Sequence, residues 1–285
     1  MKQEVPVYDT VEISESGNKS LNFLYNTIPG RILLRLFIKT TVSKTAGLIL
    51  SSPVSCFFIK GFIKKNNINM EEYKKVKYKS FNDFFIRETA EGSRPFPDKK
   101  NDLAAPGDGK LTAYPIAADS VFCVKNSRYT IEDLLQDKEL ADEFSDGICL
   151  IFRLTPDDYH RYVYIDDGEV LQHKKIKGVL HTVQPIAFRL FNVFCQNSRE
   201  YTVIQTENFG KVVQLELGAL FVGRIVNKNS FNVKRGDEKG MFQFGGSTII
   251  MLFQKDTIKI DDTIINNTLS NKETIVKMGN KIGES

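Results

Sequence analysis

The sequence FGGSTIIMLF, from Phe244 to Phe253, places two glycines and a hydroxyl directly before an apolar run. The residues from Thr248 onward are typical of a buried strand, and the glycines allow the preceding backbone unusual dihedral angles. A Gly-Gly-Ser corner between two apolar runs is also ordinary turn chemistry. The same corner suits a Ser247 hydroxyl that attacks the carbonyl of its own preceding residue, because Gly246 has no side chain to shield that carbonyl.

Other runs rich in strand-forming residues precede this one. They cover residues 147–154, 201–206, 211–217 and 220–226, and Gly, Asn and Asp separate them. Ser80 and Thr130 precede runs that indicate short capped helices, and most of the chain before residue 78 reads as helical. We therefore predict an α+β fold, with a helical N-terminal region over residues 1–77 and a mostly antiparallel β-rich domain over residues 78–285.

Composition limits the possible functions. The 285 residues are 41% apolar, which is ordinary for a chain with a buried core. The net charge of +4 is too small to indicate a nucleic-acid partner, and no nucleic-acid-binding signature is present. Neither the four cysteines nor the three histidines have zinc-site spacing, so we expect no metal and no nucleic acid.

The N-terminal region is basic and amphipathic. Seven Lys or Arg and no Asp or Glu lie between Arg31 and Lys65, and Arg31, Arg35 and Lys39 follow helical spacing on one face. Such a segment suits an anionic bilayer surface. The alternative is a helical pair packed on the protein's own core with solvated lysines. No uncharged apolar run reaches the roughly 20 residues that span a bilayer.

Three residue types in this chain could support nucleophilic chemistry. His160 directly follows a strand-like run, at the kind of strand end where sites are often built, and His181 is the second candidate imidazole. Asp108, between two glycines, is either part of a turn or a carboxylate that orients an imidazole. With Ser247 these residues give the order Asp, His, Ser, which is compatible with a triad but does not prove one. A lone histidine is more often structural or merely exposed.

Several blocks of this sequence, taken together and in order, resemble the phosphatidylserine decarboxylase family. Each block alone is weak, but seven in family order are specific. They are residues 81–87 (FNDFFIR), 106–110 (PGDGK), 158–162 (DYHRY), 181–187 (HTVQPIA), 207–210 (ENFG), 218–223 (GALFVG) and 239–248 (KGMFQFGGST).

The resemblance implies a pyruvoyl-dependent enzyme that cuts its own chain between Gly246 and Ser247. A β chain of residues 1–246 and an α chain of residues 247–285 would result, and Ser247 would become the pyruvoyl group. The serine amine of phosphatidylserine would form a Schiff base with that group, lose CO2 and leave as phosphatidylethanolamine. The covalent group supplies the electron sink that pyridoxal phosphate supplies elsewhere.

The resemblance also implies partners and a location. The partners are phosphatidylserine in an anionic membrane and the two chains of the precursor itself. With the basic segment, this predicts peripheral binding to the cytoplasmic face of the cell membrane. The oligomeric state stays open, with a homodimer as one option.

One departure from the family pattern concerns the base. Many members carry a second histidine, assigned to self-cleavage, three positions after the first, where this chain has Val163. The base could then be His160, which the family links to decarboxylation, or His181. Arg161 could hold the substrate's phosphate or form a surface salt bridge.

Two other functions remain as alternatives. Val163 suggests a lipid-binding homologue that no longer matures. A conventional serine hydrolase is disfavoured because the sequence has no Gly-x-Ser-x-Gly elbow.

Overall fold

A computed structural model describes residues 8–13, 19–124, 127–220, 224–228, 230–245 and 247–285. Its centre is a nine-stranded sheet in the order β1-β16-β3-β6-β14-β10-β9-β8-β12, and all neighbouring strands in it are antiparallel. The α+β prediction is confirmed. The strands are β1 (Thr10–Glu12), β3 (Gly109–Pro115), β6 (Ile148–Leu154), β8 (Gly168–Ile176), β9 (Arg199–Thr206), β10 (Lys211–Gly218), β12 (Asn232–Val233), β14 (Ser247–Phe253) and β16 (Lys272–Val276).

Three smaller sheets complete the described strands. Their orders are β11-β13-β7, β15-β17-β2 and β4-β5. The strands are β2 (Asp102–Ala104), β4 (Val121–Val124), β5 (Ser127–Thr130), β7 (Arg161–Val163), β11 (Arg224–Asn227), β13 (Glu238–Gln243), β15 (Lys259–Ile260) and β17 (Lys281–Glu284). The first of these sheets matters most for function, because β7 directly follows His160.

Strand β14 lies inside the nine-stranded sheet and is buried along its whole length. Its neighbours are β6 and β10, which place Leu154 and Gly218 opposite Ser247. A continuous apolar run is what a strand buried on both faces requires. Ser247 is therefore held at the first residue of a deeply buried strand.

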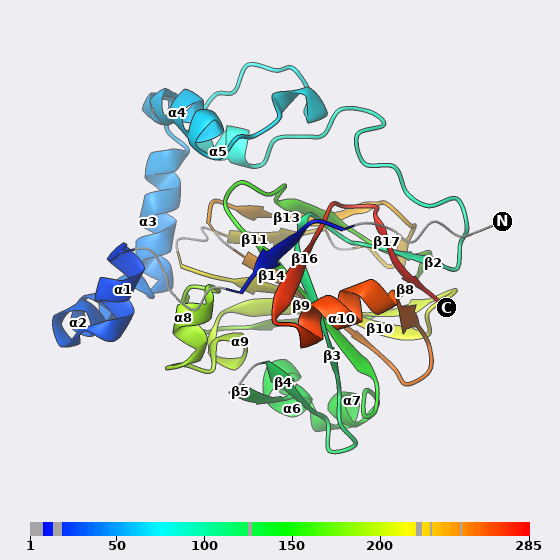
Figure 1. The fold of residues 1–285 in the computed structure, drawn as a ribbon. Helices are drawn as coiled ribbons and strands as arrows, with labels where there is room; N and C mark the ends of the chain where they lie inside the picture. Colours follow the sequence, from blue (N-terminus) through cyan, green and yellow to red (C-terminus); the bar gives the residue numbers. More distant parts are fainter. Residues whose placement is uncertain (1–7, 14–18, 125–126, 221–223, 229, 246) are drawn as a thin grey trace.

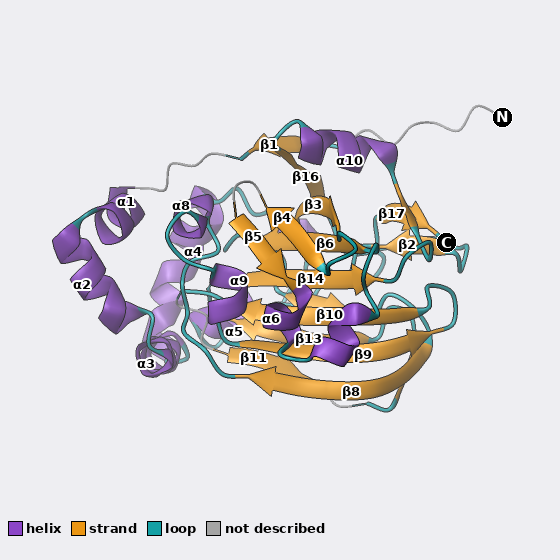
Figure 2. Ribbon diagram, turned by 90° about the horizontal axis from the view of Figure 1, so that it is seen from below, coloured by secondary structure: helices purple, strands orange, loops and turns teal. Residues whose placement is uncertain are grey.

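The N-terminal helices form an arm beside the strands. It contains α1 (Lys19–Asn26), α2 (Ile28–Phe37), α3 (Thr40–Leu50) and α4 (Phe57–Lys65), and in both views α1–α3 lie to one side of the sheets (Figure 1, Figure 2). The side chain of Thr27 accepts a hydrogen bond from the Gly30 N–H and caps α2, which carries proline in its first turn. We call α1–α4 the helical arm.

Strand β1 was not expected, because most of the chain before residue 78 reads as helical and its first residues gave no periodic pattern. Its residues Thr10–Glu12 pair with Lys272–Thr274 of β16. Three residues from before the arm thus extend the edge of the main sheet. The sequence around β1 is polar and shows no alternation of apolar and polar residues, so it did not predict this strand. The strand forms because it pairs with a partner more than 250 residues away.

The described residues contain no single helix that is both long and apolar enough to cross a bilayer. Two helical segments, Thr40–Leu50 and Pro53–Lys65, meet the length and composition only when taken together, and the chain bends by 76° between them.

An aromatic cluster joins the helical arm to the β structure. Phe81, Phe84 and Phe85 of α5 (Phe81–Phe85) are buried. The Phe62 ring of α4 lies 5.1 Å from Phe81, and on the other side Phe244 lies 5.5 Å from Phe85. The arm therefore reaches the segment that leads into Ser247.

Among the described residues, five further α-helices follow α5 in the chain. They are α6 (Ile131–Leu135), α7 (Lys138–Asp142), α8 (Pro185–Phe188), α9 (Val193–Gln196) and α10 (Asp262–Leu269).

Candidate active site

Ser247 is fully buried, and its hydroxyl has no hydrogen-bond partner among the described residues. The backbone before it is unusual: φ is 34° at Phe244 and 122° at Gly245. Glycine adopts such angles readily, but a bulky residue pays about 1–3 kcal/mol for them. The neighbouring Gly246, the other half of the expected cleavage site, lies outside the described residues. Ser247 thus combines a free hydroxyl with a strained approach segment.

His160 lies at the start of β7 with its ring completely buried. Its Nδ1 lies 2.8 Å from the carbonyl oxygen of Asp158. Because a carbonyl only accepts, Nδ1 carries the proton, which leaves Nε2 as an acceptor. Nε2 has no partner in the described part of the chain. Burial lowers the pKa of His160 to about 3, against the opposing effect of the Asp158 carbonyl, so the imidazole is a neutral base near neutral pH.

The loop that carries His160 is fixed by its own ion pair. The carboxylate of Asp158 accepts hydrogen bonds from Nζ of Lys110 at 2.7 and 2.8 Å and from the N–H of Thr155 at 2.6 Å. The carbonyl of the same Asp158 orients the imidazole. The block DYHRY therefore works as one unit in which the aspartate holds the histidine through its backbone.

His160 and the segment before Ser247 lie side by side. The Phe242 N–H donates to the His160 carbonyl at 2.9 Å, and the Gly245 backbone is close enough to affect the pKa of His160. The Phe85 ring contacts both sides, with centroid distances of 4.1 Å to His160 and 5.5 Å to Phe244. Two of the sequence-predicted residues, His160 and Ser247, are thus brought into one buried region.

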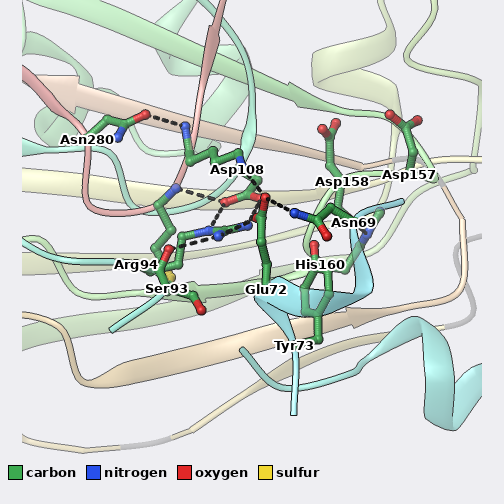
Figure 3. A network of polar contacts seen from close by, with 12 residues as sticks. Asn69, Glu72, Tyr73, Ser93, Arg94, Asp108, Asp157, Asp158, His160 and Asn280 are labelled. Atoms are coloured by element: carbon green, nitrogen blue, oxygen red, sulfur yellow. Dashed lines mark hydrogen bonds and ion pairs between the residues drawn. The ribbon is translucent and has the colours of Figure 1, made fainter. Parts of the chain in front are cut away.

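Asp108 is not paired with a histidine. Its two carboxylate oxygens accept hydrogen bonds from Nε and Nη2 of Arg94 at 3.0 and 2.8 Å, and one of them also accepts from the Met278 N–H at 2.8 Å. Figure 3 shows this pair on one side of the view and His160 with Asp158 on the other. In the described residues no hydrogen bond joins Asp108 to an imidazole, because Arg94 already holds the carboxylate from two directions.

Val163 fills the space next to the Asp108 loop. It is buried in a small cluster with Tyr73, Tyr159 and Met278, and its N–H donates to the Pro106 carbonyl at 2.9 Å. Met278 therefore shares the cluster of Val163 and also donates its backbone N–H to Asp108. An isopropyl group stands where the family pattern places a histidine, and it cannot relay a proton.

His181 lies next to the helical arm, where it contacts Tyr25 of α1. Its ring stacks on Phe191 at 4.0 Å, and its Nδ1 lies 3.4 Å from the Tyr25 hydroxyl. Burial lowers its pKa to about 4. The side chain of Asn197 binds the carbonyls of both His181 and Gly218, the residue opposite Ser247. His181 thus approaches the Ser247 region through backbone contacts.

Arg161 is already neutralised. Its Nη1 lies 2.7 Å from Glu238, its Nη2 lies 3.6 Å from Glu88, and its Nε donates to the Ile86 carbonyl at 2.8 Å. This geometry favours the salt-bridge interpretation over a phosphate contact. Sequence reasoning missed a different cation, Arg87, although it is the last residue of the block FNDFFIR.

No cluster of three or more His, Cys, Asp or Glu that could hold a metal ion occurs in the part of the chain that the structure describes.

Acid should destabilise the folded chain through His160 and His181. Their pKa values are lowered from 6.5 to about 3 and about 4. Their contribution to stability is complete above about pH 6.5, where the unfolded chain also holds them neutral. Below that pH only the unfolded chain binds protons, so each histidine lowers the free energy of unfolding by up to about 1.4 kcal/mol per pH unit until its folded pKa is reached.

Urea unfolding at about pH 7 and pH 5 measures this effect. The double variant His160→Gln and His181→Gln should lose less stability over the same interval than the unchanged chain. An identical loss in both proteins would show that other groups cause the acid sensitivity.

The comparisons with known proteins agree with one another. A family model described as phosphatidylserine decarboxylase matches residues 81–284. A phosphatidylserine decarboxylase proenzyme 2 from Clostridium acetobutylicum is 49% identical over 269 residues, covering 94% of this chain and 92% of that relative. Proenzymes of the same name without the number are 41% identical in Clostridium perfringens strain SM101, over 99% of this chain and 97% of the relative, and 42% identical in Fusobacterium nucleatum, over 94% and 91%.

Proposed function

Because the chain belongs to the phosphatidylserine decarboxylase family and is thus a carboxy-lyase, we propose that it matures by cutting itself between Gly246 and Ser247. We further propose that the mature form uses a pyruvoyl group made from Ser247 to convert phosphatidylserine to phosphatidylethanolamine and CO2. The observation that carries this proposal is the buried Ser247 hydroxyl, which has no partner among the described residues and follows a segment whose Gly245 backbone acts on the buried His160 imidazole.

In self-cleavage the Ser247 oxygen attacks the Gly246 carbonyl. The C–N bond of that peptide breaks, and an ester forms in its place. Elimination then releases the carboxylate of residue 246, and hydrolysis with loss of ammonia leaves a ketone on residue 247. The strain at Phe244 supports this sequence, because relief of an unfavourable backbone angle favours the cut state.

His160 is the proposed base for the Ser247 proton. Its Nδ1 proton is directed at the Asp158 carbonyl, which leaves Nε2 unprotonated, and its ring lies at the Gly245 backbone that leads into Ser247. General-base assistance of this kind contributes about 10²–10⁴-fold to a rate. His181 is the weaker candidate, because its ring stacks on Phe191 and contacts Tyr25.

In the second reaction the covalent pyruvoyl group would supply a carbonyl electron sink. The chain's own contribution is a dry, shaped environment. Phe81, Phe84 and Phe85 are at most 3% exposed, and the Phe85 ring lies 4.1 Å from the fully buried ring of His160. His160 would supply the proton that takes the place of the CO2.

The direct test is an assay of purified protein with vesicles that contain phosphatidylserine labelled at the serine carboxylate. We expect equal amounts of labelled CO2 and phosphatidylethanolamine, and we expect hydroxylamine, which reacts with ketones, to stop the reaction. Protein that releases no CO2 and yet binds the vesicles would support the lipid-binding alternative.

The helical arm is the proposed contact with the membrane. Large apolar side chains on it are exposed, among them Ile28 at 70%, Leu48 at 75%, Ile49 at 64% and Phe57 at 86%. Exposed apolar patches of this kind mark interaction surfaces. A groove of about 810 Å³ lies between α2 and the segment around His181. We place the arm on an anionic leaflet such as the cytoplasmic one, as a peripheral contact.

Neutralising the basic face of the arm should weaken this contact. Arg31 and Arg35 of α2 are exposed, and so is Lys39, the N-cap residue between α2 and α3. At about 1 kcal/mol per cation, replacing all three by glutamine should lower the affinity for phosphatidylserine vesicles about 100-fold at low salt. Vesicle flotation measures it, and raising the salt to about 0.5 M should weaken the unchanged protein as well.

A matched control replaces Lys138, Lys255 and Lys259, three exposed cations outside the arm, by glutamine. The net charge changes by the same amount, but vesicle binding should stay close to that of the unchanged chain. Equal losses in the two triple variants would mean that net charge, not the arm, governs binding.

A further inference from the structure

Arg87 is a buried cation without a counter-ion. Its side chain is only 2% exposed, and its guanidinium lies 4.2 Å from the Tyr73 ring centre. Nη2 donates to the Tyr73 hydroxyl at 3.2 Å and to the Asp157 carbonyl at 3.1 Å. Nε and Nη1 have no partner, and no described carboxylate lies within ion-pair distance. A buried charge in this state is costly unless something else completes it.

Other arginines of this molecule have partners for their guanidinium groups. Arg94 is held by Asp108, Arg153 by Glu273 and Arg161 by Glu238. Arg199, also buried, donates to backbone carbonyls from all three of its nitrogens. Arg87 therefore differs from its neighbours in leaving two guanidinium nitrogens free.

Tyr78 adds a further donor to the same place. Its hydroxyl is buried without a hydrogen-bond partner in the described residues. Its ring packs edge-on against Phe84 at 5.3 Å, and the Arg87 guanidinium lies 5.1 Å from that ring. Burial raises the pKa of Tyr78, and the nearby charge of Arg87 opposes this effect. The three N–H groups on Nε and Nη1 of Arg87 and the O–H of Tyr78, without acceptors among the described residues, match an oxyanion that offers several lone pairs.

Arg87 lies between the helical arm and His160. On the arm side, Phe84 contacts Phe62 of α4 at 6.0 Å. On the other side, Arg87 Nη2 and His160 Nδ1 both approach the Asp158 carbonyl, at 3.5 and 2.8 Å. The succession from the arm inward is thus apolar rings, then Arg87 with Tyr78, then His160, then the Ser247 region.

A lipid such as phosphatidylserine has the same succession of groups. Its acyl chains come first, then the phosphodiester, then the serine amine and carboxylate. With the acyl chains at the arm and the amine at residue 247, the phosphodiester falls at Arg87. A cation bound to the substrate's carboxylate would stabilise the negative charge that is lost when CO2 forms. Such a contact would slow decarboxylation, so it is the less favourable position for Arg87.

We propose that Arg87, assisted by Tyr78, binds the phosphodiester of the phosphatidylserine headgroup. The identity of the ligand rests on the proposed function, whereas the anion site itself rests on the unpartnered donors. Arg161, the cation expected from the sequence, keeps its ion pairs instead.

The test compares Arg87→Met with the unchanged enzyme on soluble dihexanoylphosphatidylserine. Methionine keeps an unbranched apolar stem but removes the charge. Loss of charge-assisted hydrogen bonds should raise KM and lower kcat/KM about 10- to 100-fold. Self-cleavage should proceed as before, since it involves no lipid, and it reports that the fold is intact. Arg87→Lys should recover part of the loss, because lysine supplies a point charge without the planar fork.

A second ligand separates the two anions of the substrate. Dihexanoylphosphatidylglycerol has the phosphodiester but neither the amine nor the carboxylate. Its inhibition constant should rise in Arg87→Met by about the same factor as KM. As a matched control, Arg235→Met removes another arginine with an unpartnered Nε, and both constants should stay unchanged.

The outcomes are distinct. A cut Arg87→Met enzyme with unchanged constants overturns the proposal, and so does a raised KM with an unchanged inhibition constant, which would assign Arg87 to the carboxylate. If Arg87→Met fails to fold, the same measurements on Arg87→Lys replace it. Increases in KM and in the inhibition constant support the site, and unchanged values of both overturn the proposal. Failure of the proposed function would instead show as an unchanged chain that neither cuts itself nor releases CO2.

Discussion

Ser247→Ala should give a single uncut chain of 285 residues that releases no CO2 from phosphatidylserine. The substitution removes the attacking oxygen and the precursor of the ketone at the same time. It should cost little stability, because the Ser247 hydroxyl has no partner that would be left unsatisfied. A denaturing gel shows the uncut chain, and thermal unfolding within a few degrees of the mature protein shows that it is folded.

Thr248→Val is the matched control for this prediction. Thr248 is also buried, and its hydroxyl also lacks a partner, but it points to the other face of β14 because side chains alternate along a strand. This variant should cut itself. Persistent cleavage in Ser247→Ala would mean that the site lies elsewhere in the chain.

His160→Gln should slow self-cleavage by about 10²–10⁴-fold. Glutamine preserves polarity and approximate size but provides no basic nitrogen. The time course of processing during synthesis in a cell-free system measures this rate directly. In the unchanged chain the rate should not fall between about pH 8 and pH 5 through titration of His160, because the pKa of this residue is lowered to about 3.

His181→Gln is the natural comparison, since His181 is another buried histidine with a lowered pKa. It should mature close to normally. Slow cleavage in His181→Gln with normal cleavage in His160→Gln would transfer the role of base to His181. A His160→Gln chain that cuts normally but releases no CO2 would restrict His160 to decarboxylation.

Val163 is the residue that makes these experiments informative. It is buried in one cluster with Met278, and its N–H donates to the Pro106 carbonyl at 2.9 Å, whereas Asp108 itself is held by Arg94. A chain with this arrangement has to activate Ser247 without an imidazole at position 163. The unprotonated Nε2 of His160 offers such a route. A chain in which neither His160 nor His181 activates Ser247, and which stays uncut, would be the non-maturing lipid binder.

Local signals predicted much of the fold. The apolar run after Ser247 became β14, and the hydroxyls of Ser80 and Thr130 accept hydrogen bonds from the N–H groups of Asp83 and Asp133 at 3.1 and 3.0 Å. These features depend on neighbours only a few residues away. Helical spacing also placed Arg31 and Arg35 on α2, but Lys39 lies outside that helix, because α2 ends at Phe37 and Lys39 is the N-cap of α3.

The polar contacts of the site could not be predicted in the same way. The pairing of Asp108 with Arg94 and the position of Met278 depend on how a long loop and the C-terminal strands come together. The isolation of Arg87 is harder still to foresee, because a sequence shows which charges exist but not which ones lack partners. The matched block ending in Arg87 was the only hint.

The intact mass of freshly purified protein tests the central claim most directly. The account predicts two fragments, residues 1–246 and residues 247–285, of which the smaller lacks a free amine and gains the mass of one hydrazine-type carbonyl reagent. A single unbroken chain that ignores such reagents would contradict it.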